Sequence, residues 1–280
     1  MTDSPLARAD LALPLVSGLA CLTGLMVGSF LNVVVHRVPA SLSVISPRSA
    51  CPACGHALRD RDNIPVVSWL LLRGRCRDCA APISARYPAV EAGTALLFGL
   101  VAARTPASPE LLALLIVTSA GVALALIDLE HQRLPFALTG TAAALASTVL
   151  AAGWVWTWRV WGAPAAWDQA LPALGGAALW LTVYGLIHLV TSGRGMGLGD
   201  VALAPVLGLV LGAVGTEQSV VGLASGFALG AVAGALLLAR GRARGGSRLP
   251  FGPFMLVGAA AGLFAGPTLA AAYLGLTGLA

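Results

Sequence analysis

Eight apolar segments divide this chain of 280 residues, and they restrict it to a membrane-spanning fold. The first segment, residues 11–35, contains no charged side chain and exceeds the roughly 20 residues that a helix needs to cross a bilayer. Only 10% of all residues are charged, whereas an ordinary soluble domain has about 25%. The sequence therefore predicts an all-α polytopic membrane protein with about eight transmembrane helices.

A polar insert separates the first apolar segment from the others. The remaining seven segments cover residues 88–103, 111–127, 135–155, 170–190, 201–215, 219–239 and 249–273. The predicted organisation is a first transmembrane helix (1–35), an insert (36–87) and a seven-helix membrane domain (88–280). Glycine and alanine are frequent in the apolar segments, and small residues allow helices to approach closely in lipid.

The basic residues of the chain are all arginines, and their distribution indicates the topology. Eight spans place alternate loops on opposite sides, and fourteen of the arginines then fall on the side of the insert. These are Arg37, Arg48, Arg59, Arg61, Arg73, Arg75, Arg77, Arg86, Arg133, Arg194, Arg240, Arg242, Arg244 and Arg248. Because cytoplasmic loops carry an excess of basic residues, we expect the insert to face the cytoplasm. No aromatic residues alternate with these arginines as in a single-strand binding groove, so no nucleic-acid partner is expected.

Four cysteines in the insert form two Cys-x2-Cys pairs. Cys51 and Cys54 make the first pair, and Cys76 and Cys79 follow after 21 residues. This arrangement predicts a structural zinc ion with four thiolate ligands. Two disulfide bridges are the alternative, but they are rare in the reducing cytoplasm. The fifth cysteine, Cys21, lies in the middle of the first segment and is expected to pack as a small apolar side chain.

Two aspartates lie at the edges of apolar segments on the same predicted side. Asp128 follows the segment 111–127, and Asp200 precedes the segment 201–215 after a glycine-rich stretch. Taken singly, each has a structural interpretation, as a charge at the end of a span or as an acidic residue at a helix N-terminus. Together they predict a carboxylate dyad that shares a proton and activates water, since carboxylates at membrane depth are functional candidates.

Two other classes of protein would also use some of these features. A transporter could carry protons or cations on paired carboxylates, but it would place them near the middle of the membrane and within inverted repeats. A membrane-anchored zinc module acting as a scaffold would leave the aspartate pair unexplained. The sequence does not indicate an oligomeric state.

Several strings of residues, in order along the chain, resemble the prepilin peptidases of the type IV leader peptidase family. They are GSFLNVVVHRVP (28–39), RSACPAC (48–54), DNIPVVSW (62–69), RGRCRDC (73–79), RYPAVE (86–91), GLGD (197–200) and PFGPF (250–254), together with Asp128. The resemblance extends over nearly the whole chain. The chain departs from the family at Ala202, where a lysine is usual.

The resemblance implies an aspartic endopeptidase of the bacterial inner membrane, with Asp128 and Asp200 as its catalytic residues. It implies cleavage of the short basic leader of prepilins or pseudopilins, in type IV pilus or type II secretion pathways, on the cytoplasmic side of the bilayer. It also implies methylation of the new N-terminus with S-adenosylmethionine. By motif match alone, Asn63, Arg86 and Glu91 are the expected cofactor-binding residues. An ion pair between Arg86 and Glu91 at the head of the second span is the alternative.

Overall fold

The structure is a computed structural model that describes residues 5–241 and 250–278, with side chains from residue 13 onward. Arg242, Arg244 and Arg248, and the first residue of the predicted last segment, Leu249, lie outside the described residues, as does the side chain of Arg8. The chain divides into two compact units, residues 1–107 and 108–280. The contacts between residues place the second apolar segment, 88–103, in the first unit. The predicted domain boundary after residue 87 stays a prediction.

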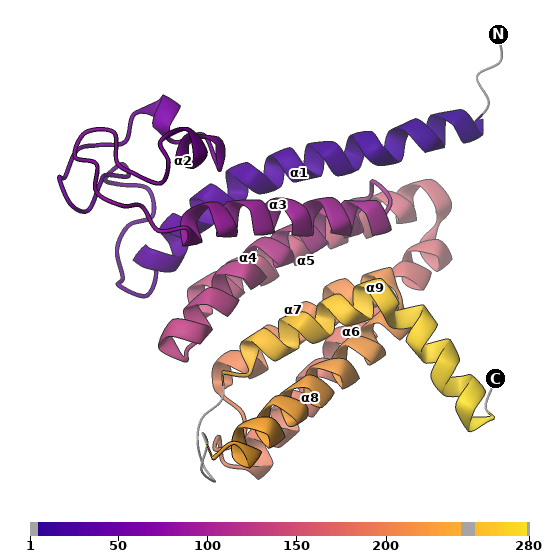
Figure 1. The fold of residues 1–280 in the computed structure, drawn as a ribbon. Helices are drawn as coiled ribbons and strands as arrows, with labels where there is room; N and C mark the ends of the chain where they lie inside the picture. The colour runs from indigo at the N-terminus through magenta and orange to yellow at the C-terminus, as the bar shows by residue number, and fades with distance from the viewer. Residues whose placement is uncertain (1–4, 242–249, 279–280) are drawn as a thin grey trace. The chain divides into compact units, whose positions relative to one another are not determined.

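The first unit contains two long helices that lie side by side, and the insert that connects them in sequence lies at one end of the pair (Figure 1). Helix α1 covers Pro5–Arg37, and α3 covers Arg86–Arg104. The insert carries only a 3₁₀ turn at Asp60–Asp62 and the short helix α2 at Val67–Leu71. Most of the insert is therefore irregular chain. Because regular helices and sheets contribute little to its stability, other interactions must hold its conformation.

The second unit consists of six helices, as far as the structure describes it (Figure 1). They are α4 (Pro109–His131), α5 (Phe136–Trp161), α6 (Ala163–Val190), α7 (Leu198–Val214), α8 (Thr216–Ala239) and α9 (Gly252–Thr277). Helix α4 extends past the apolar segment to His131, so Asp128 lies within its last turns. Helix α7 begins directly after Gly197, so Asp200 lies within its first turn.

The predicted all-α membrane fold is confirmed. Each of the eight predicted apolar segments corresponds to one helix, α1 or one of α3 to α9, although the described residues Pro135, Gly215, Pro250 and Phe251 lie just outside the helix bounds. Within the described residues, six helices are long and apolar enough to cross a membrane, namely α1, α4, α5, α6, α8 and α9. Helix α7 is a shorter apolar helix, and α3 has 19 residues. The chain is thus a multi-pass membrane protein.

Glycines bring the most extensively packed helix pairs into backbone contact. In the first unit, a Cβ added to Gly28 of α1 would lie 2.7 Å from the Cα of Glu91 in α3. In the second unit, Gly176 of α6 meets the backbone of Gly208 in α7, and α8 and α9 meet in the same way through glycines. The hydrophobic effect contributes little to helix association in lipid. Van der Waals contact between closely packed helices therefore supplies much of the attraction.

Gly28 therefore offers a test of this packing. We expect Gly28→Ala to lower the stability of the protein by about 1–3 kcal/mol, because the added methyl group forces α1 and α3 apart. The measurement is the midpoint of thermal unfolding of the purified protein in detergent. Gly18→Ala is the matched control on the same helix, since a Cβ there meets no atom within 4 Å. Equal unfolding midpoints for the two variants would contradict the close contact of α1 and α3 at Gly28.

Candidate functional site

The four cysteines of the insert converge on one point. Their Sγ atoms all lie within 4.8 Å of one another, and Sγ of Cys51 is 3.8 Å from Sγ of Cys79. All four are free thiols, so the two disulfide bridges of the alternative interpretation are not formed among the described residues. Four thiolates at a Zn–S distance of about 2.3 Å in a tetrahedron would have sulfurs about 3.8 Å apart. The geometry is therefore compatible with a zinc ion.

The two Cys-x2-Cys pairs use the same local turn to present their thiols. The amide of Cys51 donates to the carbonyl of His56 at 2.9 Å, and the amide of Gly55 donates back to Cys51 at 2.8 Å. The second turn repeats this pattern, with Ala80 donating to the carbonyl of Cys76 at 2.9 Å. Each pair is thus a self-contained knuckle, and this explains why the cysteine spacing predicts the site.

The thiols of the cluster influence one another's ionisation. Backbone amides of Cys54 and Ala53 donate to the sulfur of Cys51 and lower its pKa to about 7. At Cys79 the amide of Ala81 acts in the same direction, but burial and the neighbouring thiols outweigh it and raise the pKa to about 12. The cluster by itself therefore resists full ionisation. A divalent cation would supply the charge that lets all four thiols ionise.

Two ion pairs join the region of the 3₁₀ turn to the second knuckle. Arg77 binds Asp62 in a bidentate manner, with its Nη2 2.6 Å from Oδ1 and its Nε 2.9 Å from Oδ2. The hydrogen bonds from Arg77 lower the pKa of the Asp62 carboxyl. Arg59 pairs with Asp78 at 2.8 Å. Asn63 directly follows Asp62, so these contacts also fix the position of one predicted cofactor residue.

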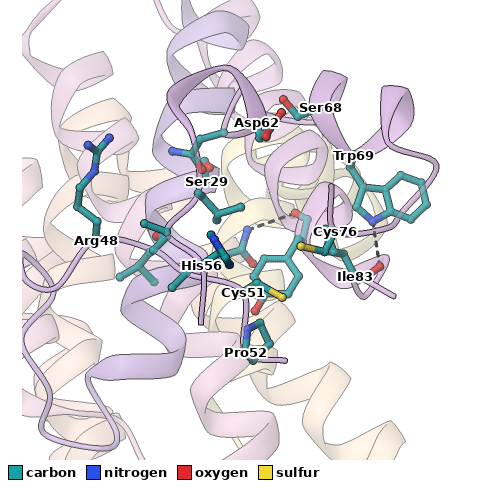
Figure 2. A pocket seen from close by; sticks show the side chains of 18 of the residues that line it. Ser29, Arg48, Cys51, Pro52, His56, Asp62, Ser68, Trp69, Cys76 and Ile83 are labelled. Atoms are coloured by element: carbon teal, nitrogen blue, oxygen red, sulfur yellow. Dashed lines mark hydrogen bonds between the residues drawn. The ribbon is translucent and has the colours of Figure 1, made fainter. Parts of the chain in front are cut away.

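A cavity of about 760 Å³ lies beside the cysteine cluster in the first unit (Figure 2). Its walls come from the end of α1, the insert and the start of α3, and Cys51 and Cys76 are among them. This volume falls within the range of small-molecule sites, about 300–1,000 Å³. The first unit therefore has a pocket large enough for a cofactor.

The structure brings two of the three predicted cofactor residues to this cavity. Asn63 and Glu91 line it, whereas Arg86 is not among its lining residues. Glu91 is only 8% exposed, and its Oε2 accepts a hydrogen bond of 2.7 Å from the amide of Val66. Val66 has a φ of 61°, which is rare for a β-branched residue and needs such support. Glu91 therefore both lines the cavity and holds the chain opposite it.

Sequence reasoning missed two further residues that shape this cavity. Asn32 of α1 donates from Nδ2 to the carbonyl of Tyr87 at 3.2 Å. Trp69 donates from Nε1 to the carbonyl of Ile83 at 3.0 Å (Figure 2). Both line the cavity. The presence of an asparagine within an otherwise apolar segment was the available signal for Asn32.

The two aspartates of the second unit are each held by a backbone amide. Asp128 is 5% exposed, and its Oδ2 accepts from the amide of Gly252 at the start of α9, at 3.1 Å. Asp200 is half-buried, and its Oδ2 accepts from the amide of Gly197, also at 3.1 Å. Each carboxylate has a second oxygen that these bonds do not use. Both side chains are thus oriented and still able to bind another group.

The helix ends that carry the two aspartates lie close together. Leu134, in the turn between α4 and α5, packs against both sites: a Cβ on Gly199 would lie 2.9 Å from its Cβ, and a Cβ on Gly252 3.2 Å from its Cδ2. The predicted pair therefore converges at the ends of α4, α7 and α9. Gly252 belongs to the string PFGPF (250–254), but nothing in the sequence indicates its role as a hydrogen-bond donor to Asp128.

These features define a multi-pass helical membrane protein with paired aspartates in one unit and a four-thiol cluster in the other. Residues 22–105 match the bacterial peptidase A24 N-terminal domain, and residues 115–240 match the type IV leader peptidase family. The chain belongs to the type IV leader peptidase family, as the sequence motifs predicted, and is a peptidase.

Similar proteins cover nearly the same length. A prepilin leader peptidase/N-methyltransferase of Stutzerimonas stutzeri is 36% identical over 91% of this chain and 92% of its own. A protein of the same name from Pseudomonas aeruginosa is 36% identical over 92% and 93%. The corresponding protein of Myxococcus xanthus is 41% identical over 82% of this chain and 66% of its own. No solved structure matches the chain.

The cysteine cluster predicts a defined metal content. We expect the purified protein to contain about one zinc ion per chain, and the double change Cys51→Ser and Cys54→Ser to remove it, because two of four ligands are lost. Metal analysis by mass spectrometry gives the stoichiometry. Cys21→Ala is the control, since Cys21 lies in α1 away from the cluster residues, and it should retain the metal. Metal-free protein with mapped disulfides would contradict the zinc site.

Proposed function

We propose that this chain is an aspartic endopeptidase that removes the leader from type IV prepilins or pseudopilins and then methylates the new N-terminus. The observation that carries the proposal is the convergence of Asp128 and Asp200, each oriented by a backbone amide. The names of the similar proteins, which combine a prepilin leader peptidase with an N-methyltransferase, support the same activity here.

In the proposed hydrolysis, one aspartate is ionised and the other is protonated. The ionised carboxylate takes a proton from water as the water oxygen bonds to the scissile carbonyl carbon. The protonated carboxyl gives its proton to the carbonyl oxygen. When the C–N bond breaks, the leaving nitrogen takes the proton from the first carboxyl, and a hydroxyl of the tetrahedral intermediate returns its proton to the second. A free amine, a carboxylic acid and the original singly protonated dyad result. The dyad shares its protons as a pair, so the two roles belong to Asp128 and Asp200 jointly.

The hydrogen bonds from Gly252 and Gly197 would serve this chemistry by preorganisation. Both carboxylates are fixed before substrate arrives, so little reorganisation is needed at the moment of reaction. Gly252 lies at the start of α9, where the positive end of the helix dipole favours a nearby negative charge. Ala202 provides no lysine ammonium near Asp200, and the acid–base steps above need none.

We place the protein in a bacterial inner membrane, with the insert and the aspartates on the cytoplasmic side. The excess of arginines in the insert supports this orientation. A substrate would then keep its apolar helix in the bilayer, with its basic leader reaching the carboxylates from the cytoplasm. Opposite charges on the leader and the site would favour their encounter.

We assign methyl transfer to the cavity of the first unit. S-adenosylmethionine supplies a methyl group from a sulfonium centre, and its transfer to the new amine leaves a neutral thioether. The cavity has the volume for such a molecule, and the carboxylate of Glu91 and the amide of Asn63 are polar groups in its wall. Glu91 would attract a cationic ligand because its charge is buried. The zinc ion would have a structural role, since all four ligand positions are thiolates.

The dyad is tested by isosteric substitution. Asp128→Asn and Asp200→Asn should each abolish leader cleavage while the protein remains folded in the membrane, because an amide cannot exchange the protons that the reaction needs. Cleavage of a purified prepilin is followed by the mass of the product. Asp168→Asn, an exposed aspartate of α6, is the matched control and should cleave normally. Full cleavage activity of either variant would contradict the assignment of Asp128 and Asp200 as the catalytic residues.

Glu91 tests whether methyl transfer resides in the first unit. Glu91→Gln keeps an oxygen for the amide of Val66 but removes the charge, so we expect the methylation rate to fall about tenfold or more, which corresponds to about 1.4 kcal/mol. Cleavage should change much less. The readout is transfer of labelled methyl groups to a pre-cleaved substrate, with leader cleavage measured on the same preparation. An equal loss of both activities would count against a separate methyl-transfer site.

A further inference from the structure

The turn between α6 and α7 carries the glycine-rich stretch that precedes Asp200, and the end of α6 holds this turn. The amide of Gly193 donates to the carbonyl of His188 at 2.8 Å, and Gly193 has a φ of 75°, which helps the chain to reverse. The amide of Gly195 donates to Oγ1 of Thr191 at 3.0 Å. The turn therefore folds back onto the C-terminal end of α6.

The imidazole of His188 also bonds to this turn. Its Nδ1 lies 2.8 Å from the carbonyl oxygen of Met196, and because a carbonyl oxygen only accepts, Nδ1 carries the proton. Met196 is only 4% exposed, so the bond is largely shielded from competing water. A Cβ on Gly193 would lie 3.2 Å from Cε1 of the ring, so this glycine leaves room for the imidazole. His188 thus presents a donor to one defined carbonyl.

The carbonyl that His188 binds belongs to the same peptide unit as the amide that binds Asp200. Met196 contributes the C=O of this unit, and Gly197 contributes the N–H, which donates to Oδ2 of Asp200 at 3.1 Å. A peptide unit is planar and rigid, and this trans unit directs its C=O and N–H to opposite sides. The imidazole and the carboxylate therefore hold opposite edges of one rigid group. A hydrogen bond to the carbonyl also polarises the N–H and strengthens its bond to the carboxylate.

We propose that His188 is a positioning residue of the peptidase site, which orients Asp200 through the peptide unit between Met196 and Gly197. The inference rests on the proposed function of the dyad and adds a residue to it. Without the imidazole, the peptide unit loses the support on its carbonyl edge, so the carboxylate of Asp200 is held less firmly. A displacement of about 1 Å at a reacting group can cost a hundredfold in rate. Because His188 acts through the backbone and not on the substrate, its loss should lower kcat and leave KM unchanged.

Three substitutions of His188 separate its hydrogen bond from the bulk of its ring. His188→Leu removes the donor, and we expect kcat for leader cleavage to fall about tenfold to a hundredfold with KM unchanged. His188→Asn restores a donor, because the side-chain nitrogen of asparagine takes the place of Nδ1, so most of kcat should return. His188→Gln places its nitrogen one atom further out and should behave like His188→Leu. It provides a polar variant without the bond, in case the apolar side chain disrupts the turn.

Thr191→Val is the matched control for the order of the turn. It removes the hydroxyl that binds the amide of Gly195, but it leaves the peptide unit between Met196 and Gly197 untouched. We expect its kcat and KM to stay close to those of the wild type. The thermal midpoint of each purified variant in detergent shows whether it is folded.

Parallel assays separate this inference from the dyad proposal. Asp128→Asn and Asp200→Asn are measured with the same prepilin. If both are inactive, and kcat falls in the folded variants without the donor but not in His188→Asn, the positioning role is supported. Wild-type kcat in those variants, an equal loss in His188→Asn, or an equal loss in Thr191→Val would each overturn it. If the aspartate variants still cleave, the dyad proposal itself fails, and this inference fails with it.

Discussion

Backbone contact between helices is the constraint on which both units depend. Gly28 in α1, Gly176 in α6 and the glycines between α8 and α9 each leave room for the neighbouring helix where any side chain would collide. A lipid environment cannot drive helices together by excluding water from apolar surface, so closeness of approach has to supply the attraction. Glu91 of α3 and Asp200 of α7 lie on helices that are positioned in this way.

Within each unit, a buried carboxylate is stabilised by a single amide from a distant part of the chain. Asp128 receives the amide of Gly252, and Glu91 receives the amide of Val66. These bonds orient the side chains and partly offset the cost of removing a charge from water. They also leave an oxygen of each carboxylate outside the bond. The proposed peptidase and methyl-transfer sites lie in different units, but each contains a buried carboxylate that a backbone amide orients.

The parts of the fold that depend on local sequence were predictable. Apolar length located all eight long helices, since a spanning helix needs a continuous run of such residues. The cysteine spacing located the four-thiol cluster, because each knuckle closes its own hydrogen bonds within a few residues. Arg86 shows the limit of motif matching, since it does not line the cavity that Asn63 and Glu91 share. The grouping of α3 with α1 likewise follows from contacts that no local pattern encodes.

The sequence by itself determined that this chain is a helical membrane protein with two aspartates at span ends and a zinc-type cysteine cluster, because run length and residue spacing are local properties. Only the tertiary structure decided which groups meet. Gly252 reaches Asp128 across 124 positions of sequence, and Val66 of the insert reaches Glu91 of α3 across 25. Such meetings are set by how helices pack, and packing depends on the shapes of many side chains at once.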